Sequence, residues 1–179
     1  KITPEQLEQA ITPSTRLFMF SSPCNPTGTV YTKEELEGLS KVFARHPQVF
    51  ILSDEIYELI NFSGRHVSIA SFPEIKERTI LINGLSKGYA MTGYRIGYLA
   101  AATPIAKACD KIQGQFTSGV NAVTQRAAIT ALNGPVEPVH AMVAEFRRRR
   151  DRVMNLIKNI SGMRCPEPPG AFYVFPDIS

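Results

Sequence analysis

Cysteine and histidine are scarce in this chain of 179 residues, which has three of each and no C-x-x-C pair. Cys24, Cys109 and Cys165 are far apart, so we expect reduced thiols in a cytoplasmic protein and no disulfide framework. The histidines are scattered as well, so the sequence predicts no metal site. No apolar run approaches the roughly 20 residues that a membrane span needs, and the opening KITPEQLEQAI does not resemble a signal peptide.

Charge is also modest, with a net value of +4, and the 44% hydrophobic and 20% charged content is ordinary for a globular protein. Much of the positive charge lies in one run, Arg147 to Arg150. This run falls within a predicted long helix, where four consecutive side chains point in different directions. We interpret it as a solvated helix surface, and we expect small-molecule partners and neither nucleic acid nor membrane.

Apolar strand patterns alternate with helical ones, which favours an α/β fold. Thr32 and Glu35 form a predicted capping box at the start of one helix. We expect a mixed, mostly parallel sheet flanked by helices over residues 1–137, and a bridging helix with the first strand of a small α+β domain over 138–179. The predicted strands are 16–22, 48–54, 79–84, 95–101 and 171–175, and the predicted helices are 32–46, 103–113, 122–132 and 136–159.

Residues 83–97 read NGLSKGYAMTGYRIG and offer two candidate nucleophiles, Ser86 and Lys87. The G-L-S-K-G part fits the G-x-S-x-G pattern of a serine hydrolase, with a predicted strand before the serine. That interpretation needs an acid and then a histidine downstream, and only Asp110 and His140 are available in that order. Because so loose a pattern is common by chance, we favour Lys87 as the reactive residue.

A reactive lysine can act by forming a Schiff base with an aldehyde cofactor, which makes the lysine the cofactor's tether. Pyridoxal phosphate (PLP) then needs a carboxylate at its ring nitrogen, donors at its phenolic oxygen, and an arginine at its phosphate. Asp54, Tyr57, Asn25 and Arg95 lie at predicted strand ends or in adjoining turns, where open α/β sheets bind ligands. Each also has a structural interpretation, such as capping for Asp54 and core packing for Tyr57.

Three motifs in this order, N-P-T-G at 25–28, S-D-E-I-Y at 53–57 and S-K-x7-R at 86–95, resemble the class I/II aminotransferases, PLP enzymes of fold type I. The segment KGYAMTGYRIGY is particularly specific, and GAFYVF from Gly170 is similar to the family's small-domain strand. Residues 113–128 are similar to the bacterial and plastid-type aspartate aminotransferase branch, some of whose members also accept prephenate. The resemblance covers essentially the whole chain.

The resemblance implies a role for each candidate residue. Lys87 would hold the cofactor in an imine and move the substrate proton, and Asp54 would keep the ring nitrogen protonated. Tyr57 and Asn25 would contact the phenolic oxygen, with Asn25 also near the substrate α-carboxylate. Arg95 would bind the phosphate, and Ser86 would assist it.

Two further features follow from the resemblance. Many relatives have a serine three positions before the lysine, where this chain has Gly84, so this chain departs from that phosphate contact. Thr117 and Ser118 fall where family members reach across a homodimer interface.

The family's N-terminal glycine-rich phosphate loop, its ring-stacking aromatic residue and its C-terminal carboxylate-binding arginine have no counterpart here, so we expect this to be the middle portion of an enzyme. The resemblance implies transamination of aspartate with 2-oxoglutarate. It leaves open an aromatic or prephenate aminotransferase, a PLP-dependent lyase, and the ligand-sensing domain of a transcription regulator.

Overall fold

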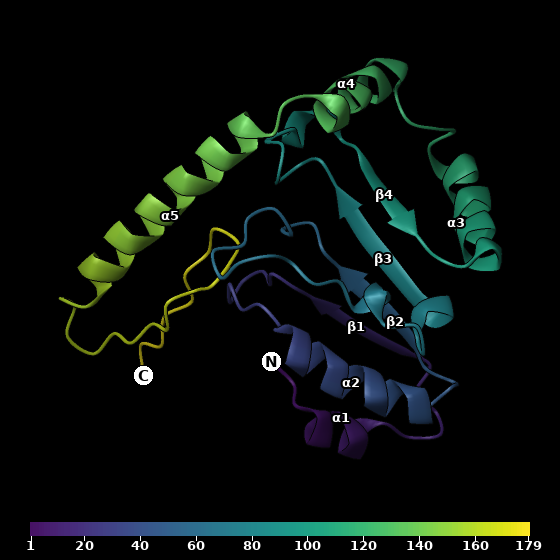
Figure 1. Cartoon of the computed structure of the whole chain (residues 1–179), viewed down its shortest axis with the longest axis horizontal. Coiled ribbons are helices and arrows are strands. Elements are labelled where there is room, and N and C mark those ends of the chain that lie inside the picture. The colour runs from purple at the N-terminus through teal and green to yellow at the C-terminus, as the bar shows by residue number, and fades with distance from the viewer.

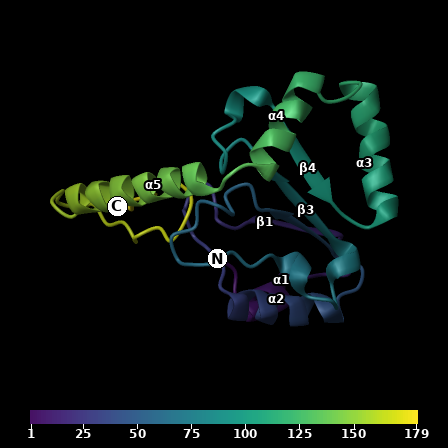
Figure 2. The same cartoon turned by 45° about the horizontal axis from the view of Figure 1, so that its top comes forward.

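The computed structural model describes residues 1–179 and shows a sheet with helices on one face and along one edge (Figures 1 and 2). None of its helices combines the length and the hydropathy that crossing a bilayer requires. Three short 3-10 turns lie at Ile69–Ser71, Lys76–Arg78 and Thr92–Tyr94. The longer elements are α1 (Pro4–Ala10), β1 (Leu17–Ser21), α2 (Lys33–Arg45), β2 (Phe50–Asp54), β3 (Thr79–Gly84), β4 (Gly97–Ala100), α3 (Thr103–Phe116), α4 (Ala122–Asn133) and α5 (Glu137–Ile157).

The four strands form one sheet in the order β1-β2-β3-β4. The pairs β1–β2 and β2–β3 are parallel, whereas β4 runs antiparallel to β3. This confirms the prediction of an α/β fold with a mixed, mostly parallel sheet. Because β4 starts where β3 ends, with Gly97 opposite Gly84, its first residues join the carboxyl ends of the three parallel strands at one edge.

The main core lies between the sheet and α1 and α2. Phe18 and Phe20 on β1 point toward this side, and Phe43 on α2 packs against Phe18 at a ring-centroid distance of 5.3 Å. α2 starts with the predicted capping box: the Thr32 side chain accepts from the Glu35 N–H, and the Glu35 carboxylate accepts from the Thr32 N–H. The alternation of strand side chains and the helix cap thus place one apolar face against another.

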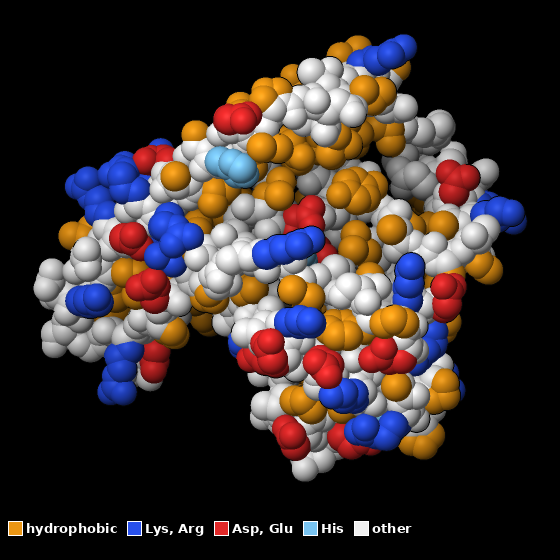
Figure 3. Space-filling model, in the orientation of Figure 1, with side chains coloured by type: hydrophobic (Ala, Val, Ile, Leu, Met, Phe, Trp, Pro, Cys, Tyr) orange, Lys and Arg blue, Asp and Glu red, His pale blue; other side chains and the backbone are white.

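The opposite face of the sheet carries apolar side chains that this chain does not cover. Met19 is 64% exposed, and Leu17, Phe50 and Leu99 are also exposed. Figure 3 shows hydrophobic side chains gathered over the middle of the molecule and beside α4. Strands in parallel sheets are usually buried on both faces, so this surface is a candidate interface.

α5 extends away from the sheet, and the C-terminal segment turns back beneath it (Figure 1). A second, smaller core of Tyr57, Ile60, Phe62 and Ala171 lies between the turn after β2 and this segment. Two members of the arginine run at 147–150 take part in this packing. The guanidinium carbons of Arg147 and Arg150 lie 5.6 and 4.9 Å from the centroid of the Phe62 ring. The remaining two arginines of the run, Arg148 and Arg149, pair with Glu145 on the exposed side of the helix.

The strand predicted at 171–175 is wrong. This segment forms no strand, and its surroundings show only isolated bridges, between Asn61 and Gly170 and between Arg164 and Asp177. The backbone of Ala171 instead donates to the Ile60 carbonyl at 2.7 Å, while Gly170 donates to Gly28 at 3.0 Å. Its strand-like composition has no neighbouring strand to pair with, so it crosses the loops that follow β1 and β2.

Candidate active site

The candidate site lies at the edge of the sheet where the parallel strands end. Asp54 is the last residue of β2, and it lies opposite Ser21 of β1 and Ile82 of β3. Lys87 follows three residues after β3, in a turn, and Arg95 precedes β4. The parallel order of the first three strands and the reversal at β4 therefore bring three connections to this edge: those that follow β1 and β2, and the one that joins β3 to β4.

Lys87 is half-buried, and its amine makes no hydrogen bond or salt bridge within the chain. Its Nζ lies 5.9 Å from the ring centroid of Tyr57 and 5.8 Å from that of Phe172. Aromatic faces attract an ammonium group but leave its nitrogen without a directed partner. The lysine is therefore held in place by aromatic rings while its amine stays available for chemistry.

Tyr57 connects Lys87 to the C-terminal segment. Its side chain is buried, and its hydroxyl lies 2.5 Å from that of Tyr173, 116 positions along the chain. Burial raises the pKa of Tyr57, and the hydrogen bond with Tyr173 and the negative charge of Asp54 raise this pKa further. Tyr57 therefore remains a protonated hydrogen-bond donor, and its phenol lies within the field of the Asp54 carboxylate.

The Asp54 carboxylate is only partly engaged. One oxygen, Oδ1, accepts the backbone N–H of Ile56 at 3.1 Å, while Oδ2 accepts no hydrogen bond from the chain. No helix starts here, because residues 56–59 form turns, so this bond caps a turn. One fixed and one free oxygen give the carboxylate a defined orientation and leave it able to accept from a ligand.

Asn25 and Arg95 are exposed at the same edge, and neither makes a hydrogen bond to Lys87. Asn25 lies in a loop with cis peptide bonds before Pro23 and Pro26. Arg95 adopts a left-handed backbone conformation, with φ of 54°, and its guanidinium donates to the Thr92 carbonyl at 2.9 Å. The structure thus places Lys87 over Tyr57 and Tyr57 within the field of Asp54, and it leaves Asn25 and Arg95 exposed at the same edge of the sheet.

The packing around Gly84 explains why this chain lacks the serine that many relatives have at this position. A Cβ at this position would lie 2.8 Å from the Ile96 carbonyl oxygen and 2.9 Å from the Gly97 Cα, both on the paired segment. Real side chains do not approach backbone atoms so closely. The close pairing of β3 and β4 therefore requires glycine here. A serine side chain could occupy this position only if a strand moved.

Ser86 does not have the surroundings of a hydrolase nucleophile. A nucleophile elbow needs a helix directly after the serine, but residues 86–89 form turns and β4 follows. Ser86 is half-buried and makes no hydrogen bond to Asp110 or His140. Its proposed assistance at a phosphate group stays a prediction.

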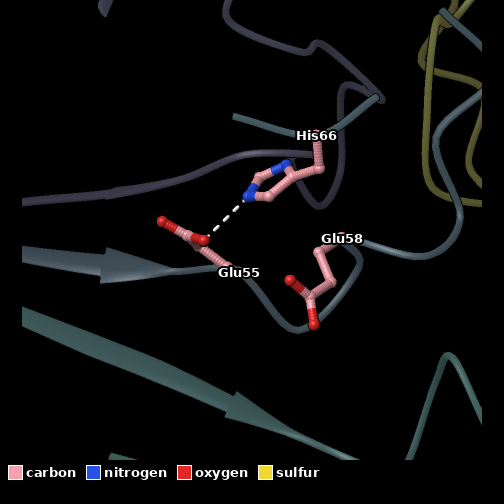
Figure 4. A group of neighbouring side chains, drawn as sticks. All are labelled: Glu55, Glu58 and His66. Atoms are coloured by element: carbon pink, nitrogen blue, oxygen red, sulfur yellow. Dashed lines mark hydrogen bonds and ion pairs between the residues drawn. The ribbon is translucent and has the colours of Figure 1, made fainter. Parts of the chain in front are cut away.

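Sequence reasoning missed the contributions of Phe172 and Tyr173, which we took for part of a strand. It also missed the buried Glu55, whose Oε2 lies 2.7 Å from His66 Nε2 (Figure 4). Only the strongly apolar G-A-F-Y-V-F composition indicated that this segment packs against other parts of the chain. Its contact with Lys87 could not be found from the sequence, because it depends on how α5 folds back.

Glu55, Glu58 and His66 also bring potential metal ligands within 4.8 Å of one another. Both oxygens of Glu55 already accept hydrogen bonds, and the second ring nitrogen of His66 is buried without a partner. A metal-binding histidine normally donates from that second nitrogen. The geometry therefore describes a hydrogen-bonded network.

Comparison with known proteins decides the family. The family model of aminotransferase class I and II matches residues 1–179. The chain belongs to this family. It is 48% identical to an aspartate/prephenate aminotransferase of Cereibacter sphaeroides, covering 100% of this chain and 45% of that one. It is also 48% identical to an aspartate aminotransferase of Geobacillus stearothermophilus, with 99% and 45% covered.

The solved structures agree with this assignment. The aspartate aminotransferase of Rhizobium meliloti superposes with a TM-score of 0.96 at 43% identity, over 98% of this chain and 44% of that one. An aromatic aminotransferase from Pyrococcus horikoshii superposes with a TM-score of 0.92 at 37% identity, over 98% and 48%. The chain thus spans slightly less than half the length of the relatives it matches, and its fold is that of aminotransferases.

The cofactor of this family is PLP, and the residues of the candidate site fit it. Lys87 presents an amine with no partner, and Asp54 presents a carboxylate oxygen with none. Tyr57 supplies a phenolic donor, and Arg95 supplies a guanidinium with only a backbone partner. The set thus offers a complementary group for the aldehyde, the ring nitrogen, the phenolic oxygen and the phosphate.

Proposed function

We propose that a protein of its relatives' length containing this chain is a PLP-dependent aminotransferase that exchanges the amino group between an amino acid and a 2-oxo acid. The amine of Lys87 carries this proposal, because it is held over Tyr57 without a partner at the edge where Asp54 ends β2. Aspartate with 2-oxoglutarate is the favoured pair, because several relatives are named aspartate aminotransferases.

Bound PLP supplies an electron sink that stabilises negative charge on the substrate α-carbon. Lys87 Nζ would hold the cofactor, and its free amine would take the proton from that carbon. Asp54 would keep a proton on the ring nitrogen, which maintains the electron sink. The Tyr57 hydroxyl and the Asn25 amide orient the phenolic oxygen, and Asn25 also contacts the substrate carboxylate.

The remaining proposed groups bind the cofactor phosphate and cover the reacting centre. Arg95 pairs with the phosphate in a charge-assisted contact, and the Ser86 hydroxyl adds a donor. Phe172, whose ring centroid lies 5.8 Å from the Lys87 amine, covers one side of the reacting centre.

We also propose that the complete protein is a homodimer in the cytoplasm. The turn between α3 and α4, which contains Thr117 and Ser118, is exposed and flanked by Phe116 and Val123, which are 82% and 73% exposed. Side chains so large and apolar at one corner are typical of an interface. All three cysteines are free, which suits a reducing compartment.

Replacement of Lys87 by alanine tests the function in the complete protein. We expect K87A to lose the absorption band of covalently attached PLP and to lower turnover by at least about 10² to 10⁴, the range for removal of a general base. Lys41→Ala is the matched control, since Lys41 pairs with Glu37 on the far side of α2. Turnover by K87A at the rate of K41A would reject the role of Lys87.

A screen of amino donors tests the substrate class. Aspartate should be turned over with 2-oxoglutarate, and prephenate and aromatic amino acids should be compared in the same assay. Failure with aspartate while an aromatic donor reacts would make the aspartate assignment wrong and leave the aminotransferase assignment standing.

A further inference from the structure

Glu55 is a carboxylate that the proposed chemistry does not use, although it adjoins Asp54 and is only 1% exposed. Its Oε1 accepts the hydroxyl of Ser53 at 2.9 Å and that of Ser68 at 2.7 Å. Its Oε2 lies 2.7 Å from Nε2 of His66. Buried charges are rare unless they are fully hydrogen-bonded, and here three donors from two segments converge on one carboxylate.

The network fixes the end of β2 on both sides. The backbone N–H of Glu55 donates to the Ile82 carbonyl of β3 at 2.8 Å, and the next N–H, that of Ile56, donates to Asp54 Oδ1. The Glu55 carbonyl then accepts the N–H of Glu58, which closes the turn that carries Tyr57. The residue between the two cofactor-facing groups is therefore held through its side chain, its N–H and its carbonyl.

Two of the three donors come from a loop that has no other role at the site. His66 and Ser68 follow the turn at 61–65, and Figure 4 shows the His66 ring facing the Glu55 carboxylate. Without Glu55, two hydroxyl groups and an imidazole would lose their shared acceptor at the base of the turn. Without His66 and Ser68, the carboxylate would be buried with Ser53 alone.

We propose that Glu55, held by His66 and Ser68, is a positioning residue that sets the orientation of the Asp54 carboxylate and the Tyr57 hydroxyl toward PLP. This inference rests on the proposed function, since it assigns Glu55 a task at the same site. The effect passes through the backbone of residues 54–57, so Glu55 itself contacts neither cofactor nor substrate.

A double-mutant cycle on the PLP dissociation constant tests the proposal in the complete protein, stripped of PLP and titrated with it. E55Q keeps the side-chain shape but replaces one acceptor oxygen by an NH2 group. We expect E55Q to weaken PLP binding about tenfold, as residues within one network do, and S68A, which removes a single donor, to weaken it less. In the D54N background E55Q should add a smaller loss than it does in the wild type, because part of its effect passes through Asp54 and only the part through Tyr57 remains.

Thr32→Ala is the matched control, because it removes the remote helix cap and lowers stability without touching the site. It should leave PLP affinity unchanged. Equal losses from E55Q with and without Asp54, or an equal loss in T32A, would show that Glu55 acts only through stability and would overturn the positioning role. Unchanged affinity in E55Q would overturn it as well.

The same proteins separate this inference from the proposed function. If the wild type transaminates aspartate and E55Q binds PLP as tightly as the wild type, only the positioning role is wrong. If E55Q is coupled to Asp54 in PLP binding but the wild type transaminates no amino acid, only the proposed function is wrong.

Discussion

Substitution of Gly84 by alanine is the sharpest test of how β3 and β4 meet beside Lys87. The added Cβ would lie 2.8 Å from the Ile96 carbonyl oxygen, 2.9 Å from the Gly97 Cα and 3.2 Å from the Ile56 Cδ1. Two of these neighbours are backbone atoms of the paired segment, so they can move only if the strand moves. Overpacking of this kind costs about 1–3 kcal/mol.

Gly93→Ala supplies the control, because no atom lies within 4 Å of a Cβ there. Glycine-to-alanine changes at permissive sites stabilise proteins by about 0.4–1 kcal/mol, since they restrict the unfolded chain. The two variants should therefore differ by about 1.5–4 kcal/mol in free energy of unfolding. At about 2–4 °C per kcal/mol for a chain of this size, the difference in Tm is on the order of 3–16 °C.

Urea denaturation followed by circular dichroism measures both free energies of unfolding under the same conditions. Because Gly84 lies three residues from Lys87, G84A should also weaken PLP binding in the complete protein, whereas G93A should not. If G84A were as stable as G93A, the close approach of β3 and β4 would be wrong, and the missing serine would need another explanation.

Three further predictions follow from the site and its supports. The raised pKa of Tyr57 means that this phenol ionises above the ordinary value of 10.0, so its contribution to stability is present below that pH and is lost as the pH rises through its folded pKa. Phenolate absorbance should show a late-titrating group that Y57F removes and Y173F shifts to lower pH; an unchanged titration in Y173F would contradict the hydrogen bond between the two tyrosines. Thr32→Ala should lower the free energy of unfolding by about 1 kcal/mol through loss of the capping box, and Thr27→Ala, outside any helix, should not reproduce this cap effect. The 179-residue chain alone, given PLP and aspartate, should form no oxoacid above background, because the expected carboxylate-binding arginine has no counterpart in it; turnover within about tenfold of the complete protein would refute this, since orientation alone supplies several kcal/mol of catalysis.

Local signals in the sequence were sufficient for most elements of the fold. The apolar run before Asp54 and the capping pair of Thr32 and Glu35 predicted β2 and the start of α2, because strands and caps depend on residues close together in the chain. The alternation of these elements favoured an α/β fold. The short helix α1 was not predicted, although Thr3 and Gln6 form a second capping box.

The candidate residues could likewise be named from the sequence, since Lys87, Asp54, Tyr57, Asn25 and Arg95 stand in an ordered set of motifs. Their roles toward PLP stay predictions. The motifs indicate which side chains belong together, but they do not indicate which of them touch.

The tertiary structure alone decided what surrounds the lysine. Phe172 and Tyr173 reach Lys87 and Tyr57 only because the chain turns back after α5, and a contact over 116 positions leaves no local pattern. The same distance effect made residues 171–175 look like a strand: their composition favours extended backbone, but a strand also needs a partner that supplies hydrogen bonds. Composition is a property of the segment itself, whereas pairing, register and burial belong to its neighbours in space.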